Sequence, residues 1–223
     1  MCGRFALEST SEQLAKVFHL AKPIPIEPRY NIAPSQDIVI IRNHTGNKIP
    51  SLARWGLIPN WSKEEKTGYK LINARSETLY EKPAFREDFQ ERRCLIPATG
   101  YFEWQPKGSR KQPYFIKMKN GSVFAMAGLW ESWRSPDGKI IESCAIITTA
   151  ANGFLSKIHE RMPAIIPLES IGLWLSTTNN DPKSMGFLQP YSPFKMTAYL
   201  VNGMVNNPKN EGPGCTRKIS YTL

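Results

Sequence analysis

A cysteine stands at the second position of the chain, in the opening stretch MCGRF. Aminopeptidases remove an initiator methionine when the next residue is small, so we expect Met1 to be lost and Cys2 to become the first residue. Cys2 would then carry a free α-amine and a thiol on neighbouring carbons. Such a 1,2-aminothiol reacts with aldehydes, because the amine forms an imine and the thiol closes onto the imine carbon. The alternative is that a cysteine at this position is incidental.

The two residues after Cys2 favour a chemical use. Gly3 allows close approach to the backbone, and Arg4 places a permanent cation beside the thiol. A neighbouring cation lowers the pKa of a cysteine thiol, and a guanidinium can also hold a phosphate. We therefore expect Arg4 either to activate the thiol or to bind an anion.

The stretch LINARSET (71–78) places an amide and a guanidinium two residues apart. In an extended strand, Asn73 and Arg75 lie on the same face. Side by side at the end of a strand, these two groups suit an anionic ligand. A capped turn that leads into a following helix would explain the same residues.

Two further segments contain groups that transfer protons. Glu103 lies among aromatic residues in TGYFEWQ (99–105), and burial there would raise the pKa of its carboxyl toward the range of a general acid or base. A structural ion pair with an arginine is the alternative for Glu103. His159 and Arg161 lie on a connection in KIHERMP (157–163), where a plain surface position is the alternative for the histidine.

Short strands outnumber helices in the sequence and do not alternate with them as βαβ units. Runs rich in β-branched and aromatic residues predict strands at 37–42, 113–118, 122–130, 140–150 and 195–201. Helices are expected at 10–19, 83–92, 151–158 and 168–175. The predicted class is α+β with a mostly antiparallel sheet, and the 223 residues fit one domain, 1–223.

The first of these helices has a start signal. Ser9 and Glu12 have the spacing of a capping box. Leu14, Val17 and Phe18 follow at helical spacing and would bury one face.

The chain is basic, with 29 Lys and Arg against 19 Asp and Glu and a net charge of +10. Such a balance favours a polyanionic partner, most often nucleic acid, although it would also serve solubility. The basic residues are spread along the chain without a long basic tail. Any binding face must therefore be assembled by folding.

Composition also excludes several classes of protein. No apolar run is long enough to span a membrane, and the N-terminus does not have the pattern of a secretory signal. The four cysteines are far apart without the spacing of a metal site. We therefore expect reduced thiols in a cytoplasmic protein, with no metal and no cofactor.

The segments MCGRF, RYNIAPS (29–35), WGLIPNW (55–61), LINARSET, GYFEW and HERMP occur in a fixed order. In this order they resemble the SRAP family, the SOS-response-associated peptidase-like proteins, which crosslink to abasic sites in single-stranded DNA. VNNPKNEGP (205–213) is similar to the closing motif of that family, so the resemblance spans nearly the whole chain. It implies a β-rich pseudo-barrel with a bifurcated sheet and short peripheral helices.

The resemblance also assigns functions to individual residues. Cys2 matches the N-terminal nucleophile, and Asn73, Glu103 and His159 match the residues that complete the active site. Further positions match residues that face DNA: Arg4, Arg75 and Arg161, which hold phosphates, and Trp55, Pro34 and Thr148, which line the surface.

The chemistry implied is a covalent link to the open-chain aldehyde of an abasic site. The α-amine of Cys2 would form an imine and its thiol would close a thiazolidine ring, with acid–base help from Glu103 and His159. A monomer is expected, and three phosphate contacts on a single strand predict a slope near −2 for log K against log salt, from about −0.7 per contact. Two alternatives remain open: a thiol peptidase that acts mainly on its own N-terminus, and a non-covalent binder of single-stranded DNA.

Overall fold

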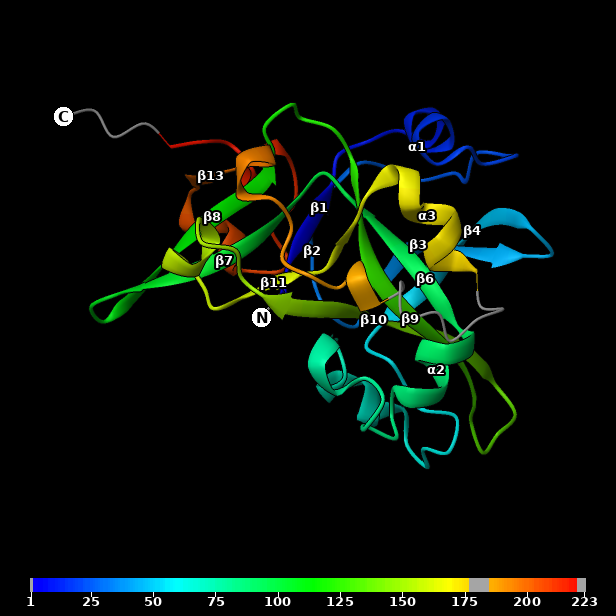
Figure 1. Cartoon of the computed structure of the whole chain (residues 1–223). Coiled ribbons are helices and arrows are strands. Elements are labelled where there is room, and N and C mark those ends of the chain that lie inside the picture. The colour runs from blue at the N-terminus through cyan, green and yellow to red at the C-terminus, as the bar shows by residue number, and fades with distance from the viewer. Residues whose placement is uncertain (1, 177–184, 220–223) are drawn as a thin grey trace.

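The computed structural model describes residues 2–176 and 185–219, and Figure 1 shows two β-rich bodies side by side. The first is an antiparallel five-stranded sheet in the order β13-β8-β7-β1-β2. Its strands are β13 (Met196–Leu200), β8 (Arg110–Met118), β7 (Gly100–Lys107), β1 (Phe5–Leu7) and β2 (Arg29–Ile32).

The second body is a closed barrel, because β10 pairs with both ends of the series β4-β3-β6-β9. Its strands are β3 (Asp37–His44), β4 (Asn47–Trp55), β6 (Arg93–Ala98), β9 (Phe124–Arg134) and β10 (Ile140–Ala150). The β10–β4 pair is parallel and the other pairs of the ring are antiparallel. Closure leaves the ring without open edges.

Three short strands extend the barrel. They are β5 (Asn73–Arg75), which pairs in parallel with β10, β11 (Arg161–Pro163), which pairs with β10 in the antiparallel sense, and β12 (Ile165–Ile166), which pairs with β9. Thus β10 carries both β5 and β11, the strands that contain the amide and arginine residues selected from the sequence. The expected α+β pseudo-barrel is confirmed, as are all five of the predicted strands.

Short helices lie at the periphery, among them α1 (Ser11–Phe18), α2 (Arg86–Glu91) and α3 (Ile171–Leu175). Leu14 and Phe18 of α1 are buried and Val17 is partly buried, as the spacing predicted. The cap of this helix differs from the expected one by one residue, because Thr10 is the N-cap and forms the capping box with Gln13. Among the described residues, no helix is both long and apolar enough to cross a bilayer.

The helix predicted at 151–158 is wrong, since only a 3₁₀ turn at Leu155–Lys157 forms there. The side chain of Asn152 explains the difference, because its Oδ1 accepts the backbone N–H groups of Phe154 and Leu155 at 3.1 and 2.9 Å. Its Nδ2 donates to the carbonyl of Tyr191 at 2.8 Å. Side-chain bonds of this kind compete with a regular helix.

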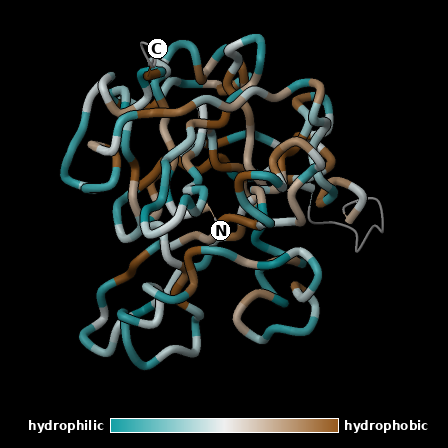
Figure 2. Tube along the Cα trace, turned by 90° about the vertical axis from the view of Figure 1, so that its left-hand side faces the viewer, coloured by the Kyte–Doolittle hydropathy of each residue, from teal (hydrophilic) through white to brown (hydrophobic). Residues whose placement is uncertain are grey.

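A continuous apolar core joins the two bodies. Hydrophobic segments gather inside the trace, and hydrophilic loops lie at its periphery (Figure 2). Phe5 of β1 and Trp55 of β4 meet edge to face with ring centroids 5.3 Å apart. This contact anchors the strand that follows Cys2 to the barrel.

Two glycines hold the connection between β4 and β5. Gly56 has φ +134°, and a Cβ built on it would lie 2.6 Å from the carbonyl oxygen of Gly68. A Cβ on Gly68 would in turn lie 2.5 Å from the carbonyl oxygen of Gly56. Only glycine permits this backbone crossing, which brings the chain back to β10 at Asn73.

Candidate active site

Cys2 lies three residues before β1, the strand of the five-stranded sheet that is labelled near the centre of Figure 1. Its side chain is fully buried. The Nδ2 of Asn73 donates a hydrogen bond of 2.9 Å to the carbonyl oxygen of Cys2. The amide predicted from LINARSET therefore holds the backbone of the cysteine, not its thiol, and β5 is the strand that presents it.

Glu103 extends from β7 and is 3% exposed. Burial raises the pKa of its carboxyl to about 7. This is the environment that the aromatic sequence around Glu103 predicted. A carboxyl with this pKa exchanges its proton readily near neutral pH.

His159 lies next to Glu103, with its Nε2 4.0 Å from Oε2 of the carboxylate. Its Nδ1 accepts the backbone N–H of Arg161 at 3.0 Å. Because Nδ1 is an acceptor, the neutral ring carries its proton on Nε2, the nitrogen nearer Glu103. Burial lowers the pKa of His159, so the neutral form is favoured.

The thiol of Cys2 does not have the environment expected from the sequence. Burial raises its pKa far above the ordinary value, and the charge of Glu103 raises the pKa further. The Nη1 of Arg4 donates to Oδ1 of Asn31 and to the carbonyl of Val205 at 2.8 and 2.7 Å. The expectation that the Arg4 cation activates the thiol is therefore wrong: of the groups of Arg4, only the backbone N–H lowers the thiol pKa, and burial outweighs it. The thiol is protonated in this state.

Asn31 is a residue that sequence reasoning missed. It is completely buried on β2, and besides accepting from Arg4 it donates to the carbonyls of Asn207 and Asn210 at 3.1 and 2.8 Å. It thereby connects Arg4 to the closing segment 205–213. The available signal was a polar residue in the segment RYNIAPS that is preceded by Tyr30 and followed by apolar Ile32 and Ala33.

Arg161 extends from β11 and is tightly held. Its Nη1 and Nη2 contact the two carboxylate oxygens of Glu77 at 2.5 and 2.9 Å. Its Nη2 also donates to the carbonyl of Thr148 at 2.8 Å. Thr148 is fully buried, so the expectation that it lines the DNA-facing surface is wrong. Its carbonyl instead positions Arg161.

Of the three arginines expected to hold phosphates, Arg75 is the exposed one. It pairs with Thr148 across the β5–β10 register, and β11 lies on the other side of β10. Asn73 and Arg75 flank buried Ala74 on a short strand, as predicted from the sequence. The two sheet contacts bring Arg75 and Arg161 to one end of β10.

Trp55 corrects a prediction. The indole is fully buried, and its Nε1 donates to the carbonyl of Ile72 at 2.9 Å, so it does not line the surface. It instead fixes the chain that leads to Asn73. Pro34 is partly buried in a turn that the backbone of Trp55 supports through a 2.8 Å bond from Ser35.

A cavity of about 640 Å³ opens beside Glu103 and His159. Its remaining lining residues are Trp104, Arg110, Lys111 and Asn206. The guanidinium of Arg4 lies 5.7 Å from the ring centroid of Trp104. The cavity therefore offers a proton-transfer pair, an aromatic ring and cations to one ligand.

The model of the SOS response associated peptidase (SRAP) family matches residues 1–208. The chain belongs to the SRAP family. Abasic site processing protein YoqW of Bacillus subtilis is 45% identical over 218 residues, which are 96% of this SRAP chain and 97% of that protein. Abasic site processing protein HMCES of Xenopus tropicalis is 31% identical over 228 residues, which cover 88% of this chain and 68% of that protein.

A solved structure shares the SRAP fold seen here. The crystal structure of a protein from Bacteroides thetaiotaomicron matches with a TM-score of 0.88 and 28% identity, over 98% of this chain and all of that one. Several of the segments that carry the resemblance are in contact in this SRAP structure, since Asn73 bonds to Cys2, Arg4 bonds to Asn31, and His159 lies beside Glu103.

Proposed function

We propose that this chain processes abasic sites in single-stranded DNA and shields them through a covalent thiazolidine link to Cys2 after removal of Met1. The observation that carries the proposal is the position of Cys2, which is held by Asn73 beside a carboxyl with a pKa of about 7. Family membership and relatives named abasic site processing proteins support the choice of substrate.

The reaction needs the free α-amine of Cys2. With Met1 attached, the nitrogen of Cys2 is an amide and forms no imine. After removal, the amine adds to the aldehyde carbon of the open sugar, and the carbinolamine loses its hydroxyl as water. The sulfur then adds to the imine carbon and the thiol proton passes to the nitrogen, so that one water is released overall.

Glu103 and His159 have complementary parts in these proton transfers. As a carboxylate, Glu103 takes the proton from the attacking amine and returns it to the departing hydroxyl. The Nε2–H of His159 is available to protonate the sugar oxygen as the ring opens. Each such group contributes typically about 10²–10⁴-fold to a rate.

The high pKa of the Cys2 thiol suits the last step. A protonated thiol is a poor nucleophile toward other targets. Near the imine it can pass its proton through Glu103 to the nitrogen as the carbon–sulfur bond forms. Burial therefore restricts the reaction to an aldehyde that has entered the site.

The arginines supply the attraction for the DNA backbone. Arg75 is exposed and ready to contact a phosphate. Arg4 and Arg161 are engaged by Asn31 and Glu77, which orients their guanidinium groups. A phosphate at Arg161 would compete with Glu77, an effect that mutation can measure.

A thiol peptidase is the second candidate, and the family description favours it. The buried, protonated thiol argues against attack on a separate peptide. Any peptidase step is therefore assigned to the bond between Met1 and Cys2. Cleavage of an unrelated peptide, lost in Cys2→Ala, would support the broader activity.

A trapping experiment separates the two covalent steps. The wild type should retain an oligonucleotide with one abasic site on a denaturing gel without further treatment. Cys2→Ala keeps an N-terminal amine after Met1 removal but lacks the thiol, so it should retain DNA only when borohydride reduces the imine. Cys144→Ala, which removes a buried thiol of β10, is the matched control and should behave as the wild type.

Two results would contradict the proposal. Retention by untreated Cys2→Ala would show that the stable link does not need the thiol. No retention by the wild type, with intact non-covalent binding, would favour the simple single-strand binder.

A further inference from the structure

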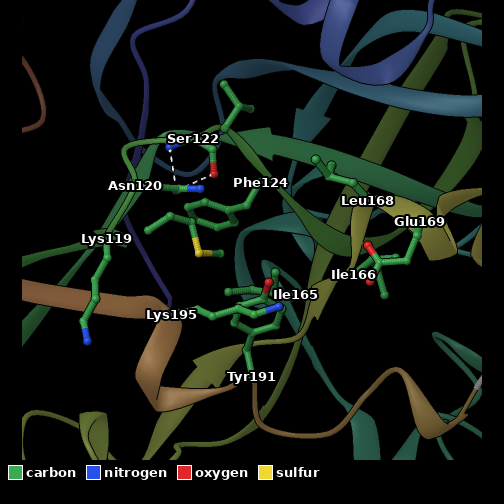
Figure 3. A pocket seen from close by; sticks show the side chains of 12 residues that line it. Lys119, Asn120, Ser122, Phe124, Ile165, Ile166, Leu168, Glu169, Tyr191 and Lys195 are labelled. Atoms are coloured by element: carbon green, nitrogen blue, oxygen red, sulfur yellow. Dashed lines mark hydrogen bonds between the residues drawn. The ribbon is translucent and has the colours of Figure 1, made fainter.

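A second cavity of about 400 Å³ lies elsewhere in the molecule and shares no lining residue with the one beside Glu103 (Figure 3). It is formed where the end of β8 and the start of β9 meet β12 and the segment 191–195. Buried Phe124, Ile165 and Ile166 provide an apolar floor. Its volume falls in the range of ligand sites, about 300–1,000 Å³.

The apolar surface continues beyond the rim. Leu168, which lines the cavity, is 45% exposed. Phe194 precedes a lining lysine in the chain and is 83% exposed, more than any other large hydrophobic residue in the described part of the chain. A small molecule confined to the cavity would leave Phe194 in water, whereas a longer chain could cover both.

The rim of the cavity is basic. Lys119 and Lys195 are exposed lining residues, and neither has an ion pair within the described residues. Lys119 lies at one side of Figure 3 and Glu169 at the other, with Lys195 between them above the ring of Tyr191. The Nζ of Lys195 is 5.9 Å from the centroid of that ring. One acidic residue thus opposes two cations.

We propose that this surface, formed by the cavity, Phe194 and the two lysines, docks an acidic peptide segment of a partner protein that carries a bulky apolar side chain. The apolar side chain would occupy the floor at Ile165 and Ile166. Carboxylates beside it would pair with Lys119 and Lys195. Recognition of this kind combines burial with charge complementarity, and it stands independently of the reaction at Cys2.

Peptide binding tests the proposal directly. The probe is a fluorescein-labelled peptide with aspartates on both sides of a single phenylalanine, and its affinity is measured by fluorescence anisotropy. We expect binding by the wild type and at least a tenfold loss in Lys119→Glu/Lys195→Glu. Glu169→Lys should bind more tightly than the wild type.

Matched controls assign the effect to the surface. Lys139→Glu changes an exposed lysine on the β9–β10 turn and should leave the affinity unchanged. Replacing the aspartates of the probe with asparagine, or its phenylalanine with alanine, should each weaken binding. Thermal unfolding of every variant verifies that the fold is retained.

Three outcomes would overturn the inference. These are no binding of the probe by the wild type, equal binding by the lysine double variant, and equal binding of the asparagine peptide. A labelled oligothymidylate that displaces the peptide and loses affinity in the same double variant would also overturn it. The surface would then be a binding site for single-stranded DNA.

Discussion

Glu103 and His159 owe their protonation states to burial and to one backbone contact. Burial raises the pKa of the Glu103 carboxyl to about 7. The backbone N–H of Arg161 fixes the tautomer of His159. The two residues therefore present a proton acceptor and a proton donor at the same pH. Neither assignment follows from residue type alone.

Glu103→Gln should slow crosslinking at pH 7 by about 10²–10⁴-fold, the usual contribution of one acid–base group. In the wild type the rate should rise through the Glu103 pKa of about 7 and again as the α-amine loses its proton near about 7.7–8.0. The variant should keep only the second rise. Single-turnover rates measured across this pH range test the assignment, and a wild-type profile in the variant would refute it.

Glu77→Gln should strengthen the initial binding of abasic DNA. Glu77 occupies the guanidinium of Arg161 and is half exposed, so removing its charge should improve affinity by about two- to fivefold, in line with a pair worth less than about 1 kcal/mol. Anisotropy with DNA whose abasic site has been reduced, and so has no aldehyde, excludes both the imine and the thiazolidine. Glu81→Gln, an exposed neighbour, serves as the control.

Weaker binding by Glu77→Gln would carry a different meaning. It would show that Glu77 mainly holds Arg161 in the orientation that the phosphate requires. Competition between the carboxylate and the phosphate would then be excluded.

At the scale of elements, the site depends on short strands that neighbouring elements hold in place. β5 and β11 pair with β10, and the closing segment 205–213 is attached to β2 through Asn31. Each strand is too short to be stable alone. The barrel therefore provides the rigidity that the site residues lack.

Asn31→Ala should destabilise the protein by about 2–3 kcal/mol, because it removes a fully buried amide that donates to two carbonyls of the closing segment and accepts from Arg4. Hydrogen exchange should show the loss most strongly in residues 202–213. Asn31→Asp keeps the acceptor for Arg4 but faces the same carbonyls with a charge, so it should be at least as destabilising. A near-native Asn31→Asp would mean that only the bond to Arg4 matters.

The sequence predicts the helices and strands better than it predicts the burial and the bonding partners of individual side chains. All five predicted strands and the first helix form, because their β-branched runs and amphipathic spacing are local signals. The helix at 151–158 fails because Asn152 bonds to the following N–H groups. The expected positions of two side chains also fail, because Trp55 is buried and the guanidinium of Arg4 is bound to Asn31 and Val205. Both side chains contact residues that are distant in sequence.

At the scale of the whole molecule, burial of a carboxyl for function costs stability. The pKa of Glu103 is raised from 4.5 to about 7 in the folded state. Between these values the folded chain binds more protons than the unfolded chain, so this group makes the free energy of unfolding fall as pH rises. Over the full window the contribution is on the order of 3 kcal/mol, at about 1.4 kcal/mol for each pKa unit.

Glu103→Gln should remove this pH dependence. Relative to the wild type, the variant should gain stability steadily between pH 4.5 and about 7, the two pKa values of Glu103. Denaturant unfolding at several pH values measures the difference between the two proteins, in which the titration of other groups cancels. A constant difference would show that Glu103 does not titrate in this range.

The central claim is that Cys2, freed of Met1, joins an abasic aldehyde as a ring closed by its own amine and thiol. Intact-mass spectrometry of the protein, before and after incubation with abasic single-stranded DNA, tests it most directly. The account predicts a protein without Met1 and then a species with the summed mass of protein and DNA less one water, which is absent in Cys2→Ala. A processed protein that binds the DNA but gives no such species would contradict it.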